Sequence, residues 1–500
     1  MTTNCYPGLI VAGMQSSGGK TAITCILLAA LRARGVPVQP FKVGPDFIDP
    51  GYHTRIAGVS SRNLDTWLMG DDGIVDEVLA TGRDRVSIVE GVMGLFDGSD
   101  VKSDEGSTMA LARLLDRPVV LVVTAKKSGR SLAVALRGFI QESGYGRIAG
   151  IILNGVSGSS HTDYLREAIE PLAVPVLGAL PFCPELAWPE RHLGLQASQE
   201  RQLPSWQILA PLAEQYLDIN GILEIAQRTV TAPKCGRDDL PTTQGLRRGQ
   251  AQSVARPISQ GAPKRSDGGL LVPEPATERS LRIMPDEQEL IPAGRKLRIG
   301  VAMDEAFHFY YQANLDYLTS IGAELIKFSP LHDSALPADL DAVFIGGGFP
   351  EIFASQLAEN NSMRTELRSA IQQGLNCYAE CGGLMLLANE LITLDQKVYP
   401  MAGVIPGAVQ MTKALKHFGY CICSESKTSS DRFFHGHEFH HSLWSGEPEH
   451  ANLWSVRRKR GDTFRREGLS MSNLHASYVH LHFRTSSPIL ERFVDRERSL

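Results

Sequence analysis

The sequence predicts an α/β protein with two domains, each built around a mostly parallel β-sheet. Three observations support this prediction. The chain has 500 residues, which is more than a single hydrophobic core usually holds. Short apolar runs alternate with helical patterns in both its N-terminal and its C-terminal part. Between these parts, residues 231–296 contain eight prolines and no aromatic residue, so they cannot build a core of their own.

The first predicted domain, residues 1–230, alternates strand and helix patterns. Each expected strand is followed by a polar or glycine-rich turn, which is typical of a doubly wound parallel sheet. The clearest strand patterns are Leu9–Ala12, Val86–Val89, Val119–Val123 and Ile148–Leu153. The clearest helix patterns, with apolar residues at helical spacing, are Lys20–Arg34 and Ser131–Ser143.

Residues 231–296 are expected to be a long linker or a disordered insertion, and a docking arm for a partner is the alternative. The strand pattern then returns, which predicts a second α/β domain over residues 297–500. Its expected strands are Leu297–Met303, Ala323–Phe328, Ala342–Ile345 and Leu375–Ala379. After Val398 short strands dominate, so this domain is expected to end in a strand-rich tail.

The composition excludes several classes of protein. With 43% apolar and 21% charged residues, it is that of an ordinary globular protein. The net charge of −5 gives no reason to expect nucleic acid or a membrane surface as a partner. No apolar run approaches the roughly 20 residues of a membrane helix, and the start shows no secretory signal. Eight scattered cysteines resemble neither a disulfide nor a zinc framework, so a reduced, cytoplasmic protein is expected.

A phosphate-binding loop is predicted at Gly13–Thr21, between an expected strand and an expected helix. Gly18 and Gly19 allow backbone N–H groups to point at phosphate oxygens at the helix N-terminus. Lys20 is expected to reach the β- and γ-phosphates of ATP, and the Thr21 hydroxyl to hold Mg²⁺. The loop is one residue longer than the common pattern, a form known in enzymes that resemble dethiobiotin synthetase.

Two acidic residues follow expected strands near this loop. Asp46 lies in Phe41–His53 (FKVGPDFIDPGYH), which is too polar for a core strand, and Glu90 ends the run Val86–Glu90. Open α/β sheets bind ligands at the carboxyl ends of their strands. Because Mg²⁺ takes one or two carboxylates besides phosphate oxygens, Asp46 and Glu90 are its candidate ligands. Taken alone, either would read as a surface or capping residue.

A nucleophile elbow is predicted at Cys381, which follows a short strand pattern and precedes Gly382-Gly383 and a helix pattern. Small neighbours would expose the thiol at the helix N-terminus, whereas Cys377 reads as core packing. Gly347 and Gly348 follow another strand and are candidate backbone donors to an oxyanion. In Ser477–Phe483, read as one strand with two histidines on one face, His480 is favoured as the base.

A phosphate loop and a cysteine elbow in one chain suggest ATP-driven amide synthesis with glutamine as the nitrogen source. The chain resembles the cobyrinate a,c-diamide synthase family, the glutamine-dependent enzymes of corrin amidation in cobalamin biosynthesis. The segments FKVGPDFIDPGYH and Glu90–Gly98 (EGVMGLFDG) are highly specific to this resemblance. Further matches lie at Pro189–Leu195, Asp304–Tyr311, Gly346–Glu351, Ala379–Leu384, Gly436–His440 and Ala476–Phe483.

The resemblance implies a dethiobiotin synthetase-like, P-loop NTPase-like sheet in the first domain and a class I glutamine amidotransferase-like fold in the second. It also implies roles for individual residues. MgATP would be bound by Lys20, Thr21, Asp46 and Glu90. Asp97 would lie near the carboxylate that is activated, and Asn154 where related synthetases contact adenine. Cys381 and His480 would form the glutaminase pair.

Three positions depart from related patterns. Triad-type glutamine amidotransferases carry a glutamate two residues after the catalytic histidine, and here His482 takes that place. The expectation is a Cys–His dyad without a carboxylate to orient the histidine, and hence a weaker base. Ser17 replaces a frequent glycine in the phosphate loop, and Thr124 stands where an aspartate is expected.

The expected partners are cobyrinate, L-glutamine and ATP with Mg²⁺, and no nucleic acid or membrane. Hydrogenobyrinate and nickel sirohydrochlorin are alternative acceptors, since the sequence does not decide the metal status of the macrocycle. A nucleotide-binding module without catalysis is the alternative of another class, against which the intact Lys20, Glu90, Cys381 and His480 argue. The order of the two amidations, a homodimeric state and the role of residues 231–296 are left open.

Overall fold

The computed structural model describes residues 6–144, 146–183, 186, 204–228, 296–426, 432–446, 449–461 and 463–494. The predicted linker lies outside the described residues apart from Lys296, as does the motif Pro189–Leu195. The described residues on the two sides of this linker belong to one compact unit. The predicted domain boundaries stay predictions.

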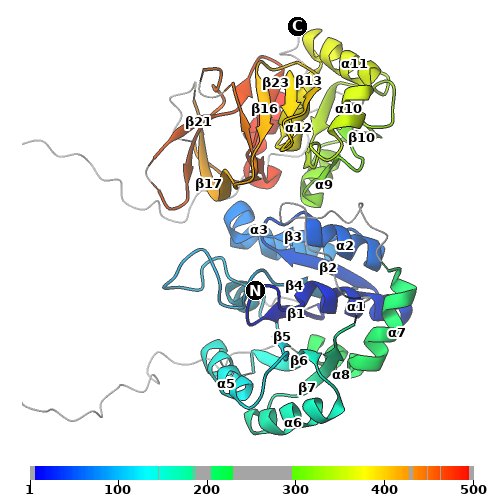
Figure 1. Cartoon of the computed structure of the whole chain (residues 1–500), viewed down its shortest axis with the longest axis vertical. Coiled ribbons are helices and arrows are strands. Elements are labelled where there is room, and N and C mark those ends of the chain that lie inside the picture. Colours follow the sequence, from blue (N-terminus) through cyan, green and yellow to red (C-terminus); the bar gives the residue numbers. More distant parts are fainter. Residues whose placement is uncertain are drawn as a thin grey trace, which may run out of the picture. The chain divides into compact units, whose positions relative to one another are not determined.

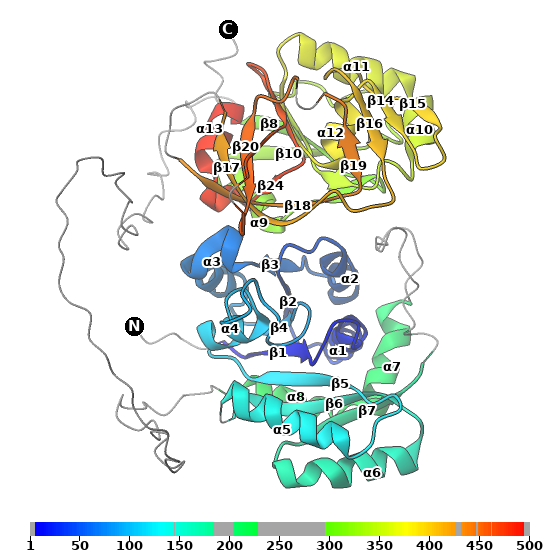
Figure 2. The ribbon, with the colours of Figure 1, turned by 60° about the vertical axis from the view of Figure 1, so that its left-hand side comes forward.

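In the described N-terminal part, seven parallel strands form one sheet in the order β3-β2-β4-β1-β5-β6-β7 (Figures 1 and 2). The predicted doubly wound parallel sheet is confirmed. The strands are β1 (Gly8–Gly13), β2 (Val38–Val43), β3 (Arg62–Leu64), β4 (Val86–Glu90), β5 (Val119–Thr124), β6 (Ile148–Val156) and β7 (Val176–Pro181).

Helices cover both faces of this sheet. Successive residues of a strand point to opposite faces, so each face has its own buried side chains. Leu9 and Val11 of β1 pack in one apolar cluster, and Ile10 and Ala12 pack in another. The first cluster lies under α1 (Lys20–Ala33), α2 (Ile48–Ala57), α7 (Trp206–Tyr216) and α8 (Ile219–Ala226). The second lies under α3 (Thr66–Thr81), α4 (Thr108–Leu114), α5 (Ser131–Ser143) and α6 (Ser159–Ile169), which η1 (Glu170–Leu172) follows.

The described C-terminal part contains a six-stranded sheet in the order β10-β8-β11-β13-β23-β22, parallel except for β22. Its strands are β8 (Leu297–Ala302), β10 (Ala323–Phe328), β11 (Ala342–Ile345), β13 (Asn376–Glu380), β22 (Leu469–Ser470) and β23 (Leu474–Ser477). The helices are α9 (Gln312–Ser320), α10 (Ala354–Glu359), α11 (Asn361–Gln372), α12 (Gly382–Leu387) and α13 (Ser487–Val494), with η3 (Phe483–Thr485) before α13.

The predicted strand-rich tail is confirmed as two antiparallel or mixed sheets within the described residues. One contains β14 (Glu390–Ile392), β15 (Val398–Pro400), β16 (Ala408–Met411) and β19 (Ser442–Trp444). The other contains β17 (His417–Glu425), β18 (Phe434–His440), β20 (Trp454–Arg458), β21 (Arg465–Glu467) and β24 (His480–Leu481). A small pair, β9 (Phe307–Phe309) with β12 (Gly347–Gly348), completes the strands.

The single strand predicted over Ser477–Phe483 is wrong. β23 ends at Ser477, and the chain then joins a different sheet as β24, which pairs with β18. Where β23 ends, hydrogen bonds to a side chain take the place of the backbone hydrogen bonds of the strand. The buried Glu467 accepts from Ser477 Oγ at 2.6 Å and from Tyr478 N at 2.7 Å. Among the described residues, no helix has the length and apolarity of a membrane span.

Candidate functional site

The phosphate loop connects β1 to α1, as the sequence predicts. Gly19 adopts a left-handed φ of 92°, and a Cβ placed on it would lie 2.1 Å from Nδ2 of Asn154. The left-handed backbone therefore favours glycine, and a side chain here would also displace the Asn154 amide. Asn154 reaches the loop from β6 and donates to the Gly18 carbonyl at 3.1 Å. Ser17 also has a left-handed φ, of 57°, which glycine would adopt more easily than serine.

Lys20 and Thr21 begin α1 and point toward the ends of neighbouring strands. The Lys20 ammonium donates to the carbonyl of Met93 at 2.6 Å, in the loop that follows β4. Burial, together with the nearby Lys42, lowers the pKa of Lys20. Thr21 Oγ1 donates to Oε1 of Glu90 at 2.8 Å. The sequence-predicted residues Lys20, Thr21 and Glu90 are thus brought together at the carboxyl ends of β1 and β4.

Glu90 is the centre of a buried charged cluster. Its side chain has 0% exposure and accepts from Lys42 Nζ at 2.8 Å on one oxygen and from His53 Nε2 at 2.7 Å on the other. Lys42 also pairs with Asp49 at 2.5 Å, and the Asp46 carboxylate lies 3.9 Å from its ammonium. Every charge in the cluster therefore has a neighbour of opposite sign or a hydrogen-bond partner.

The pKa values in this cluster move in opposite directions. Burial alone would raise the pKa of Glu90, but Lys42 and His53 outweigh it and hold that pKa well below its usual range. For Asp49, burial and the nearby Asp46 prevail over Lys42 and raise its pKa to about 8. Glu90 is therefore the carboxylate that stays ionised next to the phosphate loop.

Asp46 and Asp97 sit at the rim of this cluster. Oδ1 of Asp46 accepts from the Ile48 amide at 2.7 Å and so caps α2, while Oδ2 lies 3.9 Å from Nζ of Lys42. Asp46 is also one of the residues that line a cavity. Asp97 is exposed in the loop after β4, and its carboxylate accepts from Gly94 N at 2.8 Å. Both acids predicted from the sequence lie on loops that follow the carboxyl ends of sheet strands.

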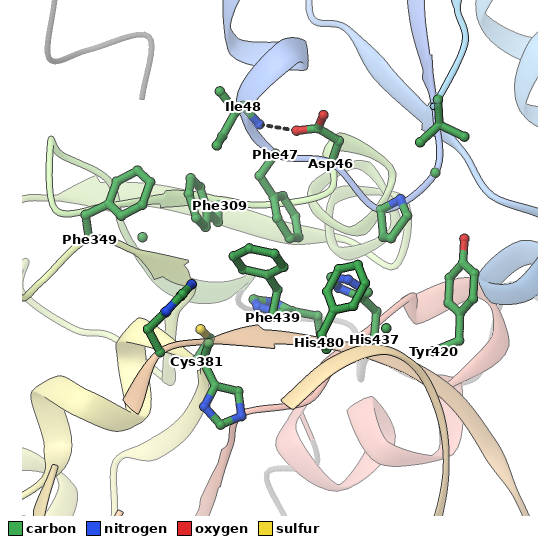
Figure 3. Close-up of a pocket in the computed structure, with 18 of the residues that line it drawn as sticks. Asp46, Phe47, Ile48, Phe309, Phe349, Cys381, Tyr420, His437, Phe439 and His480 are labelled. Atoms are coloured by element: carbon green, nitrogen blue, oxygen red, sulfur yellow. Dashed lines mark hydrogen bonds between the residues drawn. The ribbon is translucent and has the colours of Figure 1, made fainter. Parts of the chain in front are cut away.

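The cysteine elbow is present between β13 and α12 (Figure 3). Cys381 has a φ of 49°, a left-handed value that is costly for a residue with a side chain. A Cβ on Gly383 would approach the carbonyl oxygen of Ile345 to 2.2 Å, so the sharp turn needs glycine at this position. The amide of Cys381 donates to Ser477 O at 2.7 Å, which anchors the turn to β23.

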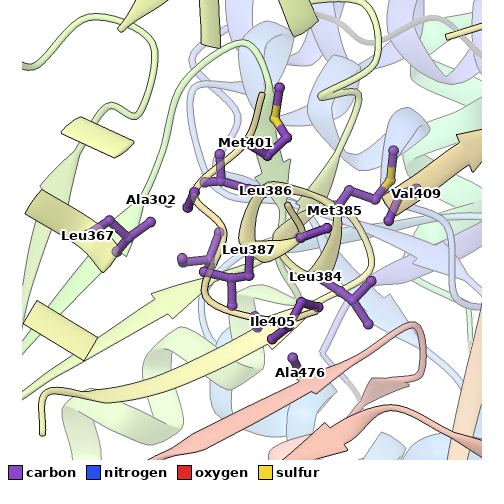
Figure 4. Packing of buried hydrophobic residues seen from close by; sticks show 14 of the residues in the cluster. Ala302, Leu367, Leu384, Met385, Leu386, Leu387, Met401, Ile405, Val409 and Ala476 are labelled. Atoms are coloured by element: carbon purple, nitrogen blue, oxygen red, sulfur yellow. The ribbon is translucent and has the colours of Figure 1, made fainter. Parts of the chain in front are cut away.

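Apolar packing fixes the helix that follows the elbow. Leu384, Leu386 and Leu387 of α12 are almost fully buried and share one cluster with Ile405 and Ala476 (Figure 4). Because protein interiors are close-packed, this cluster leaves α12 little freedom to move. The strained turn at Cys381 is therefore held in place by the helix and strands on both sides of it.

His480 lies beside Cys381, as predicted, but it is not without a carboxylate partner. Its Nδ1 lies 3.0 Å from Oε2 of Glu380, the residue that precedes the cysteine. Glu380 is buried and is held in turn by the Tyr378 hydroxyl at 2.8 Å and the Leu481 amide at 3.2 Å. The predicted dyad without an orienting carboxylate is therefore wrong, because the carboxylate comes from the strand that carries the nucleophile.

The electrostatics of the two neighbouring histidines differ. Burial alone would lower the pKa of His480, but hydrogen bonds to Cys381 and Glu380 raise it to about 10. For His482, burial lowers the pKa to about 3, so it is neutral. Its ring packs against Tyr311, with centroids 5.9 Å apart, and it is not the residue that orients His480.

Gly347 and Gly348 form β12 close to the elbow. A Cβ on Gly347 would lie 2.9 Å from Cε1 of His480, and one on Gly382 would lie 3.0 Å from the amide nitrogen of Gly348. The predicted oxyanion donors therefore lie in contact with both the histidine and the residue after the cysteine.

A cavity of about 530 Å³ lies beside Cys381 and reaches the loops that follow β2 and β4 (Figure 3). Its walls are mainly apolar side chains from both described parts of the chain. From the N-terminal part they include Gly44, Asp46, Phe47, Met93 and Ser99, and from the C-terminal part Gly348, Cys381, Tyr420, His437 and His480. The candidate thiol and the loops beside the phosphate site thus face the same cavity.

Sequence reasoning overlooked several residues of this arrangement. Lys42, Asp49 and His53 all lie in the segment FKVGPDFIDPGYH, whose unusual polarity was the available signal. For Glu380 the signal was a glutamate directly before the elbow cysteine, at the end of a strand that is otherwise buried.

Comparisons with known proteins agree with the two halves of the site. A family model described as a CobQ/CobB/MinD/ParA nucleotide binding domain matches residues 9–195. A second, described as a CobB/CobQ-like glutamine amidotransferase domain, matches residues 298–488.

Relatives match over nearly the whole chain. The chain is 38% identical over 487 residues to a cobyrinate a,c-diamide synthase from Listeria monocytogenes serotype 4b, covering 95% of this chain and 96% of that protein. It is 36% identical to the Priestia megaterium protein of the same name, with 98% and 96% covered. For the Salmonella typhimurium protein of that name the identity is 36%, with 99% and 98% covered.

Substitution of Lys42 by Met is expected to destabilise the protein by about 3–5 kcal/mol, because it leaves the buried, ionised Glu90 without its cation. The measurement is the midpoint of urea unfolding. The control is Lys397→Met, since the Lys397–Asp395 pair has side chains 68% and 56% exposed and contributes little. An unchanged midpoint for Lys42→Met would show that the cluster does not depend on this lysine.

Proposed function

Because the chain belongs to the cobyrinate a,c-diamide synthase family, we propose that it amidates the a and c acetate groups of cobyrinate in cobalamin biosynthesis. ATP activates each carboxylate, and glutamine supplies the nitrogen. The observation that carries the mechanism is the cavity into which both Cys381 and the loops beside the phosphate site open. Glutamine hydrolysis produces ammonia and amidation consumes it, so the two reactions need such a common space.

The nucleotide site fits MgATP. The phosphate loop presents backbone amides at the start of α1. When ATP binds, Lys20 would exchange its hydrogen bond to the Met93 carbonyl for contacts with the β- and γ-phosphates. Thr21, Asp46 and Glu90 are the oxygen donors that would hold Mg²⁺, which neutralises phosphate charge when bound. Asn154, which touches the loop at Gly18, contributes to the nucleotide site from β6.

Activation of the acceptor is needed because a carboxylate is a poor electrophile at neutral pH. Transfer of the γ-phosphoryl group of ATP to an acetate oxygen gives an acyl phosphate and ADP. Ammonia then adds to the acyl carbon, and inorganic phosphate leaves to give the carboxamide. Asp97, exposed on the loop after β4, lies near the carboxylate that is activated.

Ammonia comes from glutamine at the elbow. The Cys381 thiolate attacks the side-chain amide carbon, and His480 gives a proton to the departing nitrogen, so that ammonia and a thioester form. Water then cleaves the thioester, releasing glutamate and the free thiol. Amides of Gly347 and Gly348 stabilise the oxyanion. Glu380 holds His480 through Nδ1, which leaves Nε2 for the thiol.

The mainly apolar walls of the cavity favour transfer of neutral ammonia. In bulk water at neutral pH ammonia would become ammonium, which is not a nucleophile. A route within the protein from Cys381 toward the phosphate loop therefore preserves its reactivity.

The identity of the acceptor is tested by glutamate release from glutamine in the presence of MgATP. Cobyrinate, hydrogenobyrinate and nickel sirohydrochlorin are added in turn, and the product mass is measured. Stimulation by cobyrinate with the mass change of two amides supports the proposal, whereas stimulation by another macrocycle alone names a different substrate. No release with any of them favours a nucleotide-binding module. A location in the cytoplasm and a homodimeric state stay predictions.

Cys381→Ala is expected to lower glutamine-dependent amidation at least about 10³-fold, because the nucleophile is lost. Amidation with a high concentration of ammonium chloride as nitrogen source should continue at the parent rate. Both rates are measured by product mass. Loss of the ammonium-dependent reaction as well would contradict the proposal of two separate sites.

Glu90→Gln is expected to reduce amidation about 10²-fold or more with either nitrogen source, since it removes the ionised carboxylate beside Thr21. Part of the glutamine hydrolysis should survive, because the elbow is unchanged. Equal loss of amidation and glutamine hydrolysis, with the fold intact by circular dichroism, would contradict the assignment of Glu90 to the nucleotide site.

Glu380→Gln is expected to lower kcat of glutamine hydrolysis by about 10²-fold, the contribution of a well-placed acid–base group. The carboxylate helps to raise the pKa of His480 to about 10, so its removal lowers that pKa. The alkaline limb of the pH profile should therefore move to lower pH. Glu390→Gln, at an exposed glutamate of β14, is the matched control. An unmoved alkaline limb would show that Glu380 does not stabilise the imidazolium.

A further inference from the structure

Phe47 lies between the two candidate sites. It follows Asp46 directly, and its ring centroid is 5.0 Å from that of His480 (Figure 3). On its other sides the ring stacks on Phe309 at 5.2 Å, with an interplanar angle of 8°, and contacts Tyr311 at 4.6 Å. A residue of the first α/β part is thus inserted among aromatic side chains of the second.

The backbone that carries Phe47 has little independent freedom. Nδ2 of Asn63 donates to the carbonyls of Gly44 at 2.9 Å and Asp46 at 2.7 Å, which fixes the loop on both sides of Pro45. Asp46 caps α2 through the amide of Ile48, and Ile48 is buried in a small apolar cluster with Phe309 and Phe349. Asp46 and Phe47 therefore belong to one short segment whose backbone is held on both sides.

His480 depends on contacts of this kind for its orientation. Glu380 fixes the Nδ1 end of the ring. A single hydrogen bond still allows the imidazole to rotate about the axis of that hydrogen bond. Phe47 packs against the ring, while the glycine at position 347 gives it no side chain to pack against. The imidazole is thus in contact with a residue that belongs to the nucleotide side of the cavity.

We propose that Phe47 is a positioning residue for His480, through which occupancy of the nucleotide site controls hydrolysis of glutamine at Cys381. This inference rests on the proposed function, and in particular on Asp46 being a ligand of MgATP. When Asp46 coordinates the Mg²⁺ of bound MgATP, the neighbouring Phe47 moves against the His480 ring. This contact holds His480 in the orientation in which Nε2 faces the thiol. Glutamine is then consumed only when ATP is present to use the ammonia.

The test compares glutamine hydrolysis with and without MgATP and cobyrinate in the full-length protein. In the parent, the ratio of the two rates is expected to lie within about 5- to 150-fold, the usual range of coupling between sites. In Phe47→Ala this ratio should fall toward one, with the loss in kcat and an unchanged KM for glutamine. Phe47→Leu, which keeps apolar bulk without the aromatic ring, should retain part of the ratio.

Two controls separate this inference from other causes. Phe182→Ala changes an aromatic residue that is 77% exposed after β7 and should leave the ratio at the parent value. Amidation with ammonium chloride should be unchanged in Phe47→Ala, which shows that the fold and the nucleotide site are intact. Absence of ammonium-dependent amidation in the parent itself would instead overturn the proposed function.

Three results would overturn the inference. The first is a parent enzyme whose glutamine hydrolysis does not respond to MgATP and cobyrinate. The second is a Phe47→Ala variant that keeps the full ratio. The third is a Phe47→Ala variant that loses ammonium-dependent amidation together with the ratio, because this pattern indicates a structural role for Phe47.

Discussion

The buried carboxylate of Glu90 is the interaction on which the N-terminal site depends. It lies at the carboxyl end of β4, next to β1, and receives hydrogen bonds from Thr21, Lys42 and His53. These partners come from three different segments, so one anion sets the positions of the helix after the phosphate loop, of β2 and of α2. An ionised carboxylate with 0% exposure is tolerated only because each of its oxygens is paired.

The C-terminal site repeats this arrangement with different chemistry. Glu380 is also the last residue of an internal strand, is also buried, and also binds a histidine that is distant in sequence. In the first case Lys42 supplies the compensating charge, and in the second His480 itself carries it. The same feature, a buried glutamate at a strand end, therefore lies at the candidate nucleotide site in one sheet and beside the candidate thiol in the other.

The sequence was sufficient for the parts of the site that are local in the chain. The phosphate loop and the cysteine elbow are each defined by glycines within a few residues, at Gly19 and Gly383, where a side chain would collide with the structure. Strands and helices of the sheets were predictable for the same reason, because their periodicity lies within one segment. The fold class and both motifs were thus predicted correctly.

Contacts between distant segments were not predictable in this way. The hydrogen bond that His480 donates to Glu380 spans 100 positions, and the usual spacing pointed instead to position 482, where a histidine stands. Alternation of residue types made Ser477–Phe483 resemble one strand, yet hydrogen bonds to Glu467 divide it. In each case a buried charge from another element decided the outcome, and a periodicity within one segment carries no information about such a charge.

The strain at Cys381 explains how two adjacent residues can serve one histidine. Neighbouring side chains of a regular strand point to opposite faces of the sheet. The left-handed φ of 49° at Cys381 ends that alternation, and the side chains of Cys381 and Glu380 both form a hydrogen bond with His480. The ring then has one nitrogen bound to the carboxylate and the other free for the thiol. Without the strained turn, a glutamate directly before the nucleophile could not orient the base, and the carboxylate would have to come from another segment, as in triads where it follows the histidine.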